Sequence, residues 1–459
     1  MIKVVQAYDR APIAELPSDD ASALEAKLTA ARRAFLDRDG WLQPHQRIAV
    51  LARLADLMRA KVDHFARLIA REGGKPLTDA TIEAVRAVDG VRSAADELRT
   101  FAGREIPMGL TPASVGRMAF TIKEPIGVVA AISAFNHPLN LIVHQVVPAI
   151  AVGCPIIIKP ASATPLCCFE FVALVREAGL PEPWCQTFLP DNTALAEALA
   201  VDPRVAFFSF IGSPRVGWSL HGKLPAGTRS ALEHGGAAPV IVDRTADLDR
   251  AIPSLVKGGY YHAGQVCVSV QRIFVDQAIK AEFVARFTDA VAALKVGDPL
   301  SPATEVGPLI QPKEADRVLS WIEEAKAAGA TVSTGGGRLS ETTLAPTVVV
   351  EPPPTARLSR EEVFGPVTCV YGYDDIDVAI ETANSLPVAF QSAIYTQDLA
   401  RALRAARRFD ASAVMINDHT AFRTDWMPFA GRRQSGYGIG GIPWTMREMT
   451  QEKMMVFNL

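Results

Sequence analysis

The chain has 459 residues and a formal net charge of −3 at pH 7, and its length predicts more than one domain, since domains typically hold roughly 100 to 200 residues. Apolar residues make up 49% of it and charged residues 21%, an ordinary globular mixture that can bury a large core. The nearly balanced charge gives no reason to expect nucleic acid or a membrane surface as a partner.

Six cysteines, at positions 154, 167, 168, 185, 267 and 369, have neither metal-ligand spacing nor the spacing of a disulfide framework. Such cysteines are typical of a reducing compartment, so we expect a cytoplasmic protein without a metal site. The first ten residues contain no basic region followed by an apolar run, which predicts no signal peptide. The apolar stretch from Leu141 to Ile158 contains His144, Gln145 and two prolines. It therefore favours a helix followed by a buried strand over a membrane span.

The first hundred residues predict helices, because apolar residues recur three and four positions apart. The expected helices are Ala21 to Asp37, His45 to Glu72 and Thr78 to Phe101. The pattern then changes to short apolar runs bounded by Gly or Pro, which alternate with helical segments. The expected strands are Ala119 to Ile122, Gly127 to Ile132, Pro155 to Lys159 and Ala206 to Phe210, and the expected helices are His137 to Ala151 and Thr164 to Ala178. This alternation favours parallel βαβ units.

A second α/β alternation runs from near Ala238 to about Ile416. Its expected elements are helices at Asp247 to His262, Gln277 to Leu294 and Lys313 to Ala328, and strands at Ile273 to Val275 and Val367 to Tyr371. Two extended segments, Gly109 to Ile122 and Glu452 to Phe457, lie outside both alternations. Open strand edges tend to pair with another chain, so these segments predict a homo-oligomer.

The stretch from Gly264 to Arg272 places Cys267 on a short turn between an expected helix and an expected strand. A thiol in this position has a fixed backbone and an open side, as an attacking nucleophile needs. The alternative is that Cys267 is one buried structural cysteine among several. A hydrolase built on this thiol would need a histidine base, and His262 is near in sequence.

Two further residues are candidates for catalysis. Glu233 ends a strand-like run, just before two glycines at the join of the two alternations, where a carboxylate can act as a general base through water. Asn136 follows the strand that ends at Ile132, and its amide can donate a hydrogen bond to a developing oxyanion. A solvated surface glutamate and a turn-forming asparagine are the alternatives.

Other residues suit a nucleotide cofactor. Lys159 ends its strand at the crevice edge of an open sheet, where a lysine suits a ribose or a phosphate. The backbone amides of Gly212 and Ser213, at an expected helix start, are placed to meet a cofactor. The GxGxxG pattern from Gly436 to Gly441 follows no convincing strand, so we interpret it as a turn.

Eight ordered segments together resemble the NAD(P)-dependent aldehyde dehydrogenase superfamily over nearly the whole chain. They are Glu124-Pro-Ile-Gly-Val-Val, Phe135-Asn-His-Pro, Ile158-Lys-Pro-Ala, Ile211-Gly-Ser, Leu232-Glu-His-Gly-Gly, Gly264-Gln-Val-Cys, Glu361-Glu-Val-Phe-Gly-Pro and Pro428-Phe-Ala-Gly. The similarity is to lactaldehyde, semialdehyde and phosphonoacetaldehyde dehydrogenase-like members. It implies oxidation of an aldehyde to a carboxylic acid through a cysteine thiohemiacetal and a thioester.

The resemblance also implies roles for single residues. Cys267 is the implied nucleophile, Asn136 and the backbone amide of Cys267 form the implied oxyanion hole, and Glu233 activates the water that hydrolyses the thioester. Lys159 and Glu362 would hold the two riboses of NAD or NADP, with Phe364 beside the nicotinamide. The full implied cofactor set is Ile132, Ser133, Lys159, Ser162, Gly212, Ser213, Val216, Glu362 and Phe364.

The implied fold is α/β and aldehyde dehydrogenase-like. Residues 1–106 and 124–232 form a Rossmann-like cofactor domain, residues 233–440 an α/β catalytic domain, and residues 107–123 and 441–459 a small β oligomerisation arm of a homodimer or homotetramer. Ser162 stands where NAD-preferring members commonly carry a glutamate. Without that carboxylate nothing repels a 2′-phosphate, so both NAD and NADP are expected.

The substrate is implied by the residues around the aldehyde entrance, which mix small aliphatic groups, imidazoles and a guanidinium. The resemblance places His137, Leu141, His144, Val266 and Val268 around this entrance, with Phe422 and Arg423 near its outer wall. Because arginine binds anionic groups through a bidentate fork, we expect a short polar or anionic small-molecule aldehyde. Alternatively, Arg423 only pairs with Asp418 or Asp425.

Two rival functions remain at this point. A CoA-acylating aldehyde dehydrogenase has the same fold, but typically lacks the water-activating glutamate that Glu233 supplies. A cofactor-binding protein without turnover has no use for Cys267, Asn136 and Glu233 together.

Overall fold

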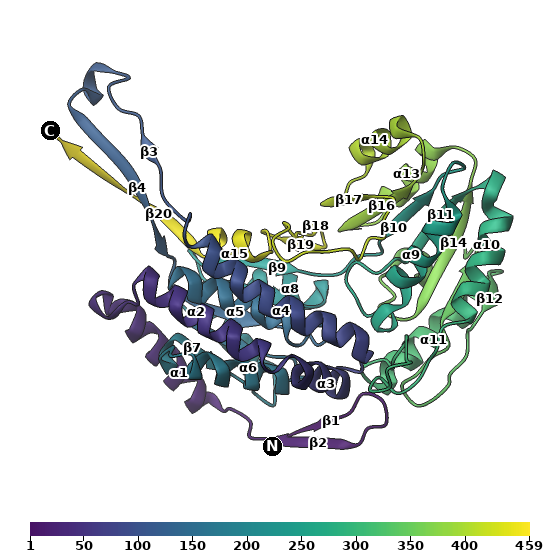
Figure 1. Cartoon of the computed structure of the whole chain (residues 1–459), viewed down its shortest axis with the longest axis horizontal. Helices are drawn as coiled ribbons and strands as arrows, with labels where there is room; N and C mark the ends of the chain where they lie inside the picture. Colours follow the sequence, from purple (N-terminus) through teal and green to yellow (C-terminus); the bar gives the residue numbers. More distant parts are fainter.

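The computed structural model describes residues 1–459 and contains two α/β domains and a projecting β arm (Figure 1). None of its helices combines the length and the apolar character that crossing a lipid bilayer requires. The α/β class and the two consecutive alternations expected from the sequence are confirmed.

The first domain is built on a six-stranded sheet with the order β19-β9-β8-β5-β6-β7, parallel except for β19. Its strands are β5 (Val128–Ile132), β6 (Ile156–Lys159), β7 (Cys185–Thr187), β8 (Val205–Ile211), β9 (Arg229–Glu233) and β19 (Gly436–Tyr437). In chain order the parallel strands lie as third, second, first, fourth and fifth. This is a doubly wound order, whose reversal between β5 and β8 creates a crevice for a ligand.

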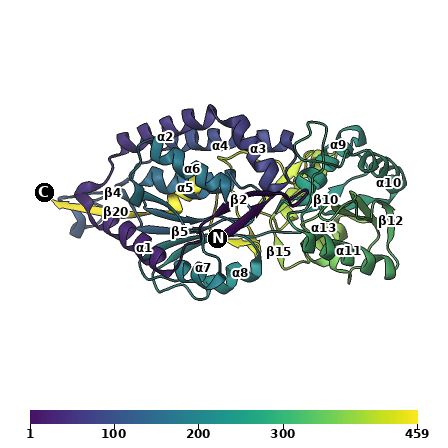
Figure 2. The same ribbon diagram turned by 90° about the horizontal axis from the view of Figure 1, so that it is seen from below.

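Helices cover both faces of this sheet (Figure 2). They are α1 (Ala21–Leu36), α2 (Pro44–Arg59), α3 (Val62–Gly73), α4 (Leu77–Glu97), α5 (Asn140–Val152), α6 (Leu166–Glu177), α7 (Thr193–Ala200), α8 (Pro214–His221) and α15 (Ile442–Glu448). Nearly every residue of α5 is buried, because α5 lies between the sheet and the helices α2 and α4. A helix covered on all sides is apolar all round, which explains its resemblance to a membrane span.

The prediction of one helix from His45 to Glu72 is wrong. The segment forms α2 and α3, which are separated at Ala60 and Lys61. Both helices pack on α4, and the break lets each turn its apolar face toward it. Neither Gly nor Pro marks the break, so the sequence gives no local signal for it.

The second domain has a seven-stranded sheet with the order β12-β13-β14-β11-β10-β16-β17, parallel except for β12. Its strands are β10 (Pro239–Val242), β11 (Arg272–Asp276), β12 (Thr331–Thr334), β13 (Thr347–Val350), β14 (Val367–Tyr373), β16 (Gln391–Tyr395) and β17 (Ala413–Ile416). Its helices are α9 (Leu248–Tyr260), α10 (Gln277–Ala292), α11 (Pro312–Ala327), α12 (Arg357–Arg360), α13 (Ile376–Asn384) and α14 (Leu399–Arg408).

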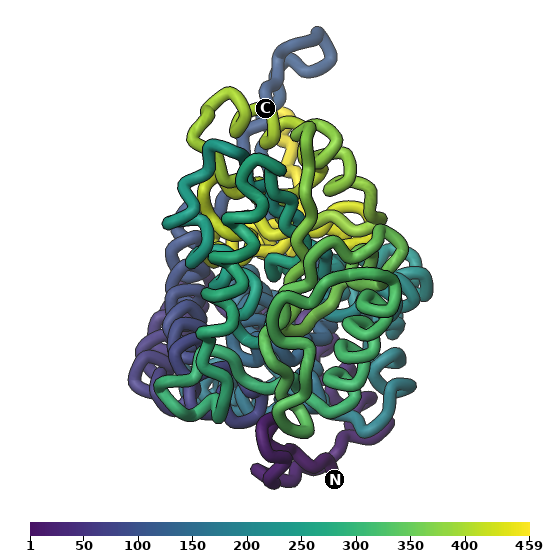
Figure 3. The backbone as a smooth tube through the Cα atoms, turned by 90° about the vertical axis from the view of Figure 1, so that its right-hand side faces the viewer, coloured from purple at the N-terminus to yellow at the C-terminus, as the bar shows by residue number.

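Short strands near both ends of the chain lie between the two domains. The hairpin of β1 (Ile2–Val5) and β2 (Pro12–Leu16) lies opposite the arm (Figure 3). It contacts the second domain, where the Thr342 hydroxyl donates to the Ala7 carbonyl. β15 (Val388–Ala389) pairs with β18 (Arg432–Arg433), and the chain then returns to the first sheet as β19.

The arm consists of β3 (Glu105–Ile106), β4 (Arg117–Pro125) and β20 (Thr450–Asn458), in the order β20-β4-β3. It projects away from both domains (Figure 1). The predicted arm boundaries differ from the structure in both segments, since β3 and β4 extend the first segment from residues 107–123 to residues 105–125. Residues 442–449 belong to the first domain, because Ile442, Met446 and Met449 are buried in the core that α4 and α5 share.

Candidate active site

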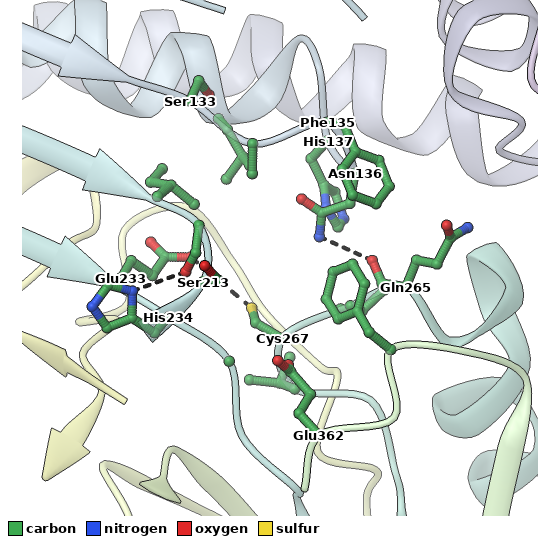
Figure 4. A pocket seen from close by; sticks show the side chains of 18 of the residues that line it. Ser133, Phe135, Asn136, His137, Ser213, Glu233, His234, Gln265, Cys267 and Glu362 are labelled. Atoms are coloured by element: carbon green, nitrogen blue, oxygen red, sulfur yellow. Dashed lines mark hydrogen bonds between the residues drawn. The ribbon is translucent and has the colours of Figure 1, made fainter. Parts of the chain in front are cut away.

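A cavity of about 770 Å³ opens between the two domains and contains most of the predicted site residues. Figure 4 shows the thiol of Cys267 between the carboxylates of Glu233 and Glu362, with Ser133, Asn136 and His137 on the facing wall. The predicted residues that line the cavity are Ile132, Ser133, Asn136, His137, Leu141, His144, Gly212, Ser213, Val216, Glu233, Val266, Cys267, Val268, Glu362, Phe364 and Arg423.

The backbone before Cys267 adopts a left-handed turn, with φ angles of 51° at His262, 53° at Ala263 and 69° at Gly264. A Cβ atom at Gly264 would collide with the carbonyl oxygen of Gly365, so glycine is needed there for space as well as for conformation. Non-glycine residues rarely adopt this conformation and need surrounding contacts to hold them in it. The turn therefore fixes where the following thiol lies.

Side-chain hydrogen bonds hold the cysteine loop on both sides. The Gln265 amide donates to the Pro308 carbonyl (3.2 Å), and its oxygen accepts from the Ile310 amide (2.9 Å). On the other side, the Thr420 hydroxyl donates to the Val268 carbonyl (2.7 Å). Cys267 is half-buried and the other five cysteines are buried, so Cys267 is the accessible thiol.

Glu233 ends β9 with one carboxylate oxygen 4.0 Å from the Cys267 sulfur. Burial raises the pKa of Glu233 to about 7, against the opposing effect of the Arg423 charge. Burial, followed by the charges of Glu233 and Glu362, raises the pKa of the Cys267 thiol well above its usual range. Burial therefore raises the pKa values of both the thiol and the neighbouring carboxyl group, that of Glu233 to about 7.

Asn136 is buried, and its side-chain amide donates to the Gln265 carbonyl (2.9 Å). An amide NH₂ group has two donors, so the second N–H remains for a ligand in the cavity. The bond to Gln265 also fixes Asn136 against the loop that carries Cys267. The predicted oxyanion donor and the predicted nucleophile therefore face the same cavity from different domains.

The cavity reaches the crevice between β5 and β8. Ser133 follows β5, and its buried hydroxyl has no hydrogen-bond partner within the protein. The Glu362 carboxylate accepts from the Gly236 amide (3.2 Å) and fills the space that a side chain at Gly235 would need. An unpaired hydroxyl at the switch point of a doubly wound sheet fits a bound dinucleotide.

Two predicted cofactor residues lie outside the cavity wall. Lys159 ends β6 as predicted, but its ammonium group donates to the neighbouring Pro160 carbonyl (3.0 Å). Ser162 is exposed on the turn that follows. The structure therefore brings neither side chain into the cavity.

The alternative that Arg423 only pairs with Asp418 or Asp425 does not hold in the structure. Asp425 instead receives two hydrogen bonds from Arg86, of 2.8 and 3.1 Å, and no carboxylate lies within ion-pair distance of Arg423 in the structure. Its guanidinium lies over the ring of Phe429, 3.5 Å from the ring centroid. Burial lowers the pKa of Arg423, against the opposing charges of Glu233 and Asp425. Phe422, expected on the outer wall, is exposed and does not line the cavity.

The sequence interpretation missed several residues of the substrate end, namely Arg86, Asn140, Tyr261 and Phe429. The Tyr261 hydroxyl lies 2.8 Å from His137 Nε2. A signal existed for one of them, since Asn140 and His144 are spaced four residues apart in a helix whose only other polar residue is Gln145. The pattern from Gly436 to Gly441, predicted as a turn, instead begins with β19, which pairs with β9, and continues to a β-bridge between Gly440 and Phe429.

Two mostly parallel α/β domains enclose a crevice at a strand-order reversal, where dinucleotides bind in doubly wound folds, and an accessible thiol faces it. The chain belongs to the aldehyde dehydrogenase family, whose model matches residues 1–455. It is an NAD(P)-dependent aldehyde dehydrogenase, which confirms the resemblance seen in the sequence.

Relatives of this chain cover its full length. It is 36% identical over 459 residues to the 3-sulfolactaldehyde dehydrogenase of Priestia aryabhattai, covering 100% of this chain and 95% of that one. Aldehyde dehydrogenase 21 from Physcomitrella patens, solved in complex with the reaction product succinate, matches with a TM-score of 0.96 and 33% identity, covering 100% and 95% of the two chains. Glyceraldehyde-3-phosphate dehydrogenase GapN from Methanocaldococcus jannaschii, complexed with NADP, matches with a TM-score of 0.95 and 32% identity, covering 100% and 99%.

Proposed function

We propose that this enzyme oxidises a short aldehyde with an anionic headgroup, a sulfonate or a carboxylate, to the corresponding carboxylic acid. The observation that carries the substrate class is the guanidinium of Arg423, which lines the cavity without a carboxylate partner. Removing a cation from water without a directly paired carboxylate is costly, and an anionic ligand in the cavity would compensate this cost. The 3-sulfolactaldehyde dehydrogenase of Priestia aryabhattai, 36% identical to this chain, supports the same class.

In the proposed mechanism Cys267 is the nucleophile and Glu233 the base. The Glu233 carboxylate, 4.0 Å from the sulfur, takes the thiol proton as the sulfur adds to the aldehyde carbon. The resulting thiohemiacetal oxyanion accepts hydrogen bonds from the Asn136 amide and the Cys267 backbone N–H. Donors held ready for a developing charge lower the barrier by roughly 3–4 kcal/mol each.

Residues of the first domain and Glu362 would hold NAD(P)⁺, which supplies a hydride acceptor when bound. Ser133, Gly212, Ser213 and Val216 line the crevice beside the strand-order reversal. Ser162 carries no charge that would repel a 2′-phosphate, so we propose that both NAD and NADP are accepted. The relative crystallised with NADP supports this reading.

Hydrolysis completes the proposed cycle. Once Glu233 has released its proton to solvent, it accepts a proton from the water that attacks the Cys267 thioester. The tetrahedral adduct then collapses, the C–S bond breaks, and the carboxylic acid leaves. A CoA-acylating enzyme would pass the acyl group to CoA instead and would have no use for a buried carboxylate beside the thiol, so hydrolysis is the favoured outcome.

Replacing Arg423 with leucine tests the substrate class. We expect kcat/KM for 3-sulfolactaldehyde to fall by about 10- to 100-fold, because hydrogen bonds to charged groups contribute roughly 1.5–3 kcal/mol. The loss for lactaldehyde, which lacks the sulfonate, should be much smaller. Arg407→Leu, at an exposed position of α14, is the matched control. Equal losses for both aldehydes would show that Arg423 does not bind the headgroup.

The arm is the proposed contact with a second copy of the chain. β20 is an edge strand of nine residues, and several apolar side chains of the arm are exposed, namely Leu110, Val115, Met118, Met454, Val456 and Phe457. Free strand edges with apolar side chains readily pair. We expect the whole chain to sediment as a dimer or tetramer and a chain shortened by residues 451–459 to sediment as a smaller species. A full-length monomer at micromolar concentration would contradict this.

A further inference from the structure

A chain of polar side chains lies behind Arg423 and joins three elements of the fold. Arg86 of α4 donates to Asp425 through Nη2 and Nε, and Asn140 of α5 donates to the same carboxylate (3.0 Å). His144 of α5 places Nε2 2.8 Å from Asp425 Oδ1 and Nδ1 3.5 Å from Arg423 Nη2. His144 therefore stands between the carboxylate and the guanidinium that faces the substrate.

The partners of His144 define its tautomer. A carboxylate oxygen only accepts, so Nε2 carries the proton and Nδ1 presents a lone pair toward Arg423. Burial lowers the pKa of His144, against the opposing hydrogen bond to Asp425, which keeps the ring neutral. An imidazolium would instead place a second positive charge against the Arg423 guanidinium, only 3.5 Å away.

The same arrangement leaves Arg423 without a directly paired carboxylate, and the charges of Glu233 and Asp425 act on it only from beyond ion-pair distance. The Asp425 carboxylate is matched by the guanidinium of Arg86, which it binds through both oxygens. The neutral imidazole contributes an acceptor but no negative charge. Phe429 supports the guanidinium from the face of its ring, 3.5 Å from the ring centroid, a contact that favours a cation without neutralising it.

We propose that His144 is a positioning residue: held by Asp425 in its neutral Nε2–H form, it orients the Arg423 guanidinium toward the anionic headgroup of the substrate. The inference rests on the proposed substrate class. At 3.5 Å the contact to Arg423 is long for a hydrogen bond between nitrogens. Its effect is therefore on the orientation of the guanidinium, and it should appear in the selectivity between anionic and neutral aldehydes.

Two substitutions of His144 separate its two contacts. Asparagine keeps an acceptor near the place of Nδ1 but loses the donor to Asp425. Glutamine reaches the place of Nε2 and keeps that donor but loses the acceptor for Arg423. For His144→Gln we expect the ratio of kcat/KM for 3-sulfolactaldehyde to that for lactaldehyde to fall about tenfold, the effect of roughly one hydrogen bond. The fall should come from KM for the anionic aldehyde more than from kcat, and His144→Asn should keep the ratio within about threefold of the wild type.

The controls distinguish this inference from the proposed function beneath it. His64→Gln, the same change at an exposed histidine of α3, should leave the ratio unchanged. One outcome is that Arg423→Leu lowers the ratio of kcat/KM for the two aldehydes, while His144→Gln and His144→Asn change it equally or not at all. The positioning role of His144 is then overturned, and the substrate class stands. If Arg423→Leu leaves the ratio unchanged, the substrate class itself fails.

A measurement on the unaltered enzyme covers the case in which the variants do not fold. The ¹⁵N shifts of histidine-labelled protein report the protonation of each ring nitrogen. We expect the His144 resonances to show a protonated Nε2 and an unprotonated Nδ1 at neutral pH. A protonated Nδ1 would remove the acceptor for Arg423 and overturn the inference.

Discussion

Replacement of Cys267 by alanine should abolish NAD(P)H formation with every aldehyde while the enzyme still binds its cofactor. Without the thiol no covalent adduct forms, and removal of a catalytic nucleophile lowers kcat by roughly 10⁴-fold or more. The expected cofactor crevice lies at the carboxyl ends of β5 and β8, in the first domain. Shortening the side chain of Cys267, which lies on a fixed loop of the second domain, should not disturb this crevice. Absorbance at the NAD(P)H band measures turnover, and calorimetric titration with NADP measures binding.

The matched control is Cys185→Ala, a change of the same size at a buried cysteine of the first domain. We expect this variant to turn over at the rate of the unaltered enzyme at 25 °C. If the Cys267→Ala enzyme retains more than about one hundredth of the rate, far above the residual activity of enzymes that lose their nucleophile, another group attacks the aldehyde. A loss of NADP binding together with turnover would show a structural effect instead.

Much of the fold could be predicted because its signals are local. The strands of a parallel sheet are buried on both faces, and β5, β6 and β8 accordingly appear in the sequence as continuous apolar runs. The break between α2 and α3 could not be predicted, since it depends on how both helices meet α4. The same applies to α15, whose apolar residues look like an exposed terminal segment until α4 and α5 lie against them.

The residues proposed for catalysis stand in motifs that the sequence shows, but their environment could not be predicted. Cys267 and Glu233 each stand at a junction between elements, where the chain pattern itself changes. Arg86 and Asp425, by contrast, are 339 residues apart and meet only in the folded protein. For Lys159 the position was predicted correctly, at the end of β6, but the direction of its side chain was not. Its ammonium group donates to the Pro160 carbonyl and does not line the cavity.

Replacement of Glu233 by glutamine should separate oxidation from hydrolysis. Glutamine keeps the size of the side chain but cannot accept a proton from water, and loss of a general base costs roughly 10²- to 10⁴-fold in rate. The thioester would therefore accumulate. On rapid mixing with aldehyde and NAD(P)⁺ we expect a burst of about one NAD(P)H per active site, the stoichiometry of a single covalent turnover, followed by slow steady-state release.

The pH dependence provides an independent check on Glu233. Its pKa is raised to about 7 by burial, so the carboxylate form that the base needs is lost as the pH falls through 7. When hydrolysis limits turnover, kcat should fall about tenfold for each pH unit well below that value. This acidic limb should be absent from the Glu233→Gln enzyme, which has no carboxyl group to protonate. If that variant keeps the steady-state rate of the unaltered enzyme at neutral pH, or keeps the acidic limb, Glu233 is not the base of the hydrolytic step. The substitution removes only the Glu233 carboxylate, so either result would show that another group activates the water.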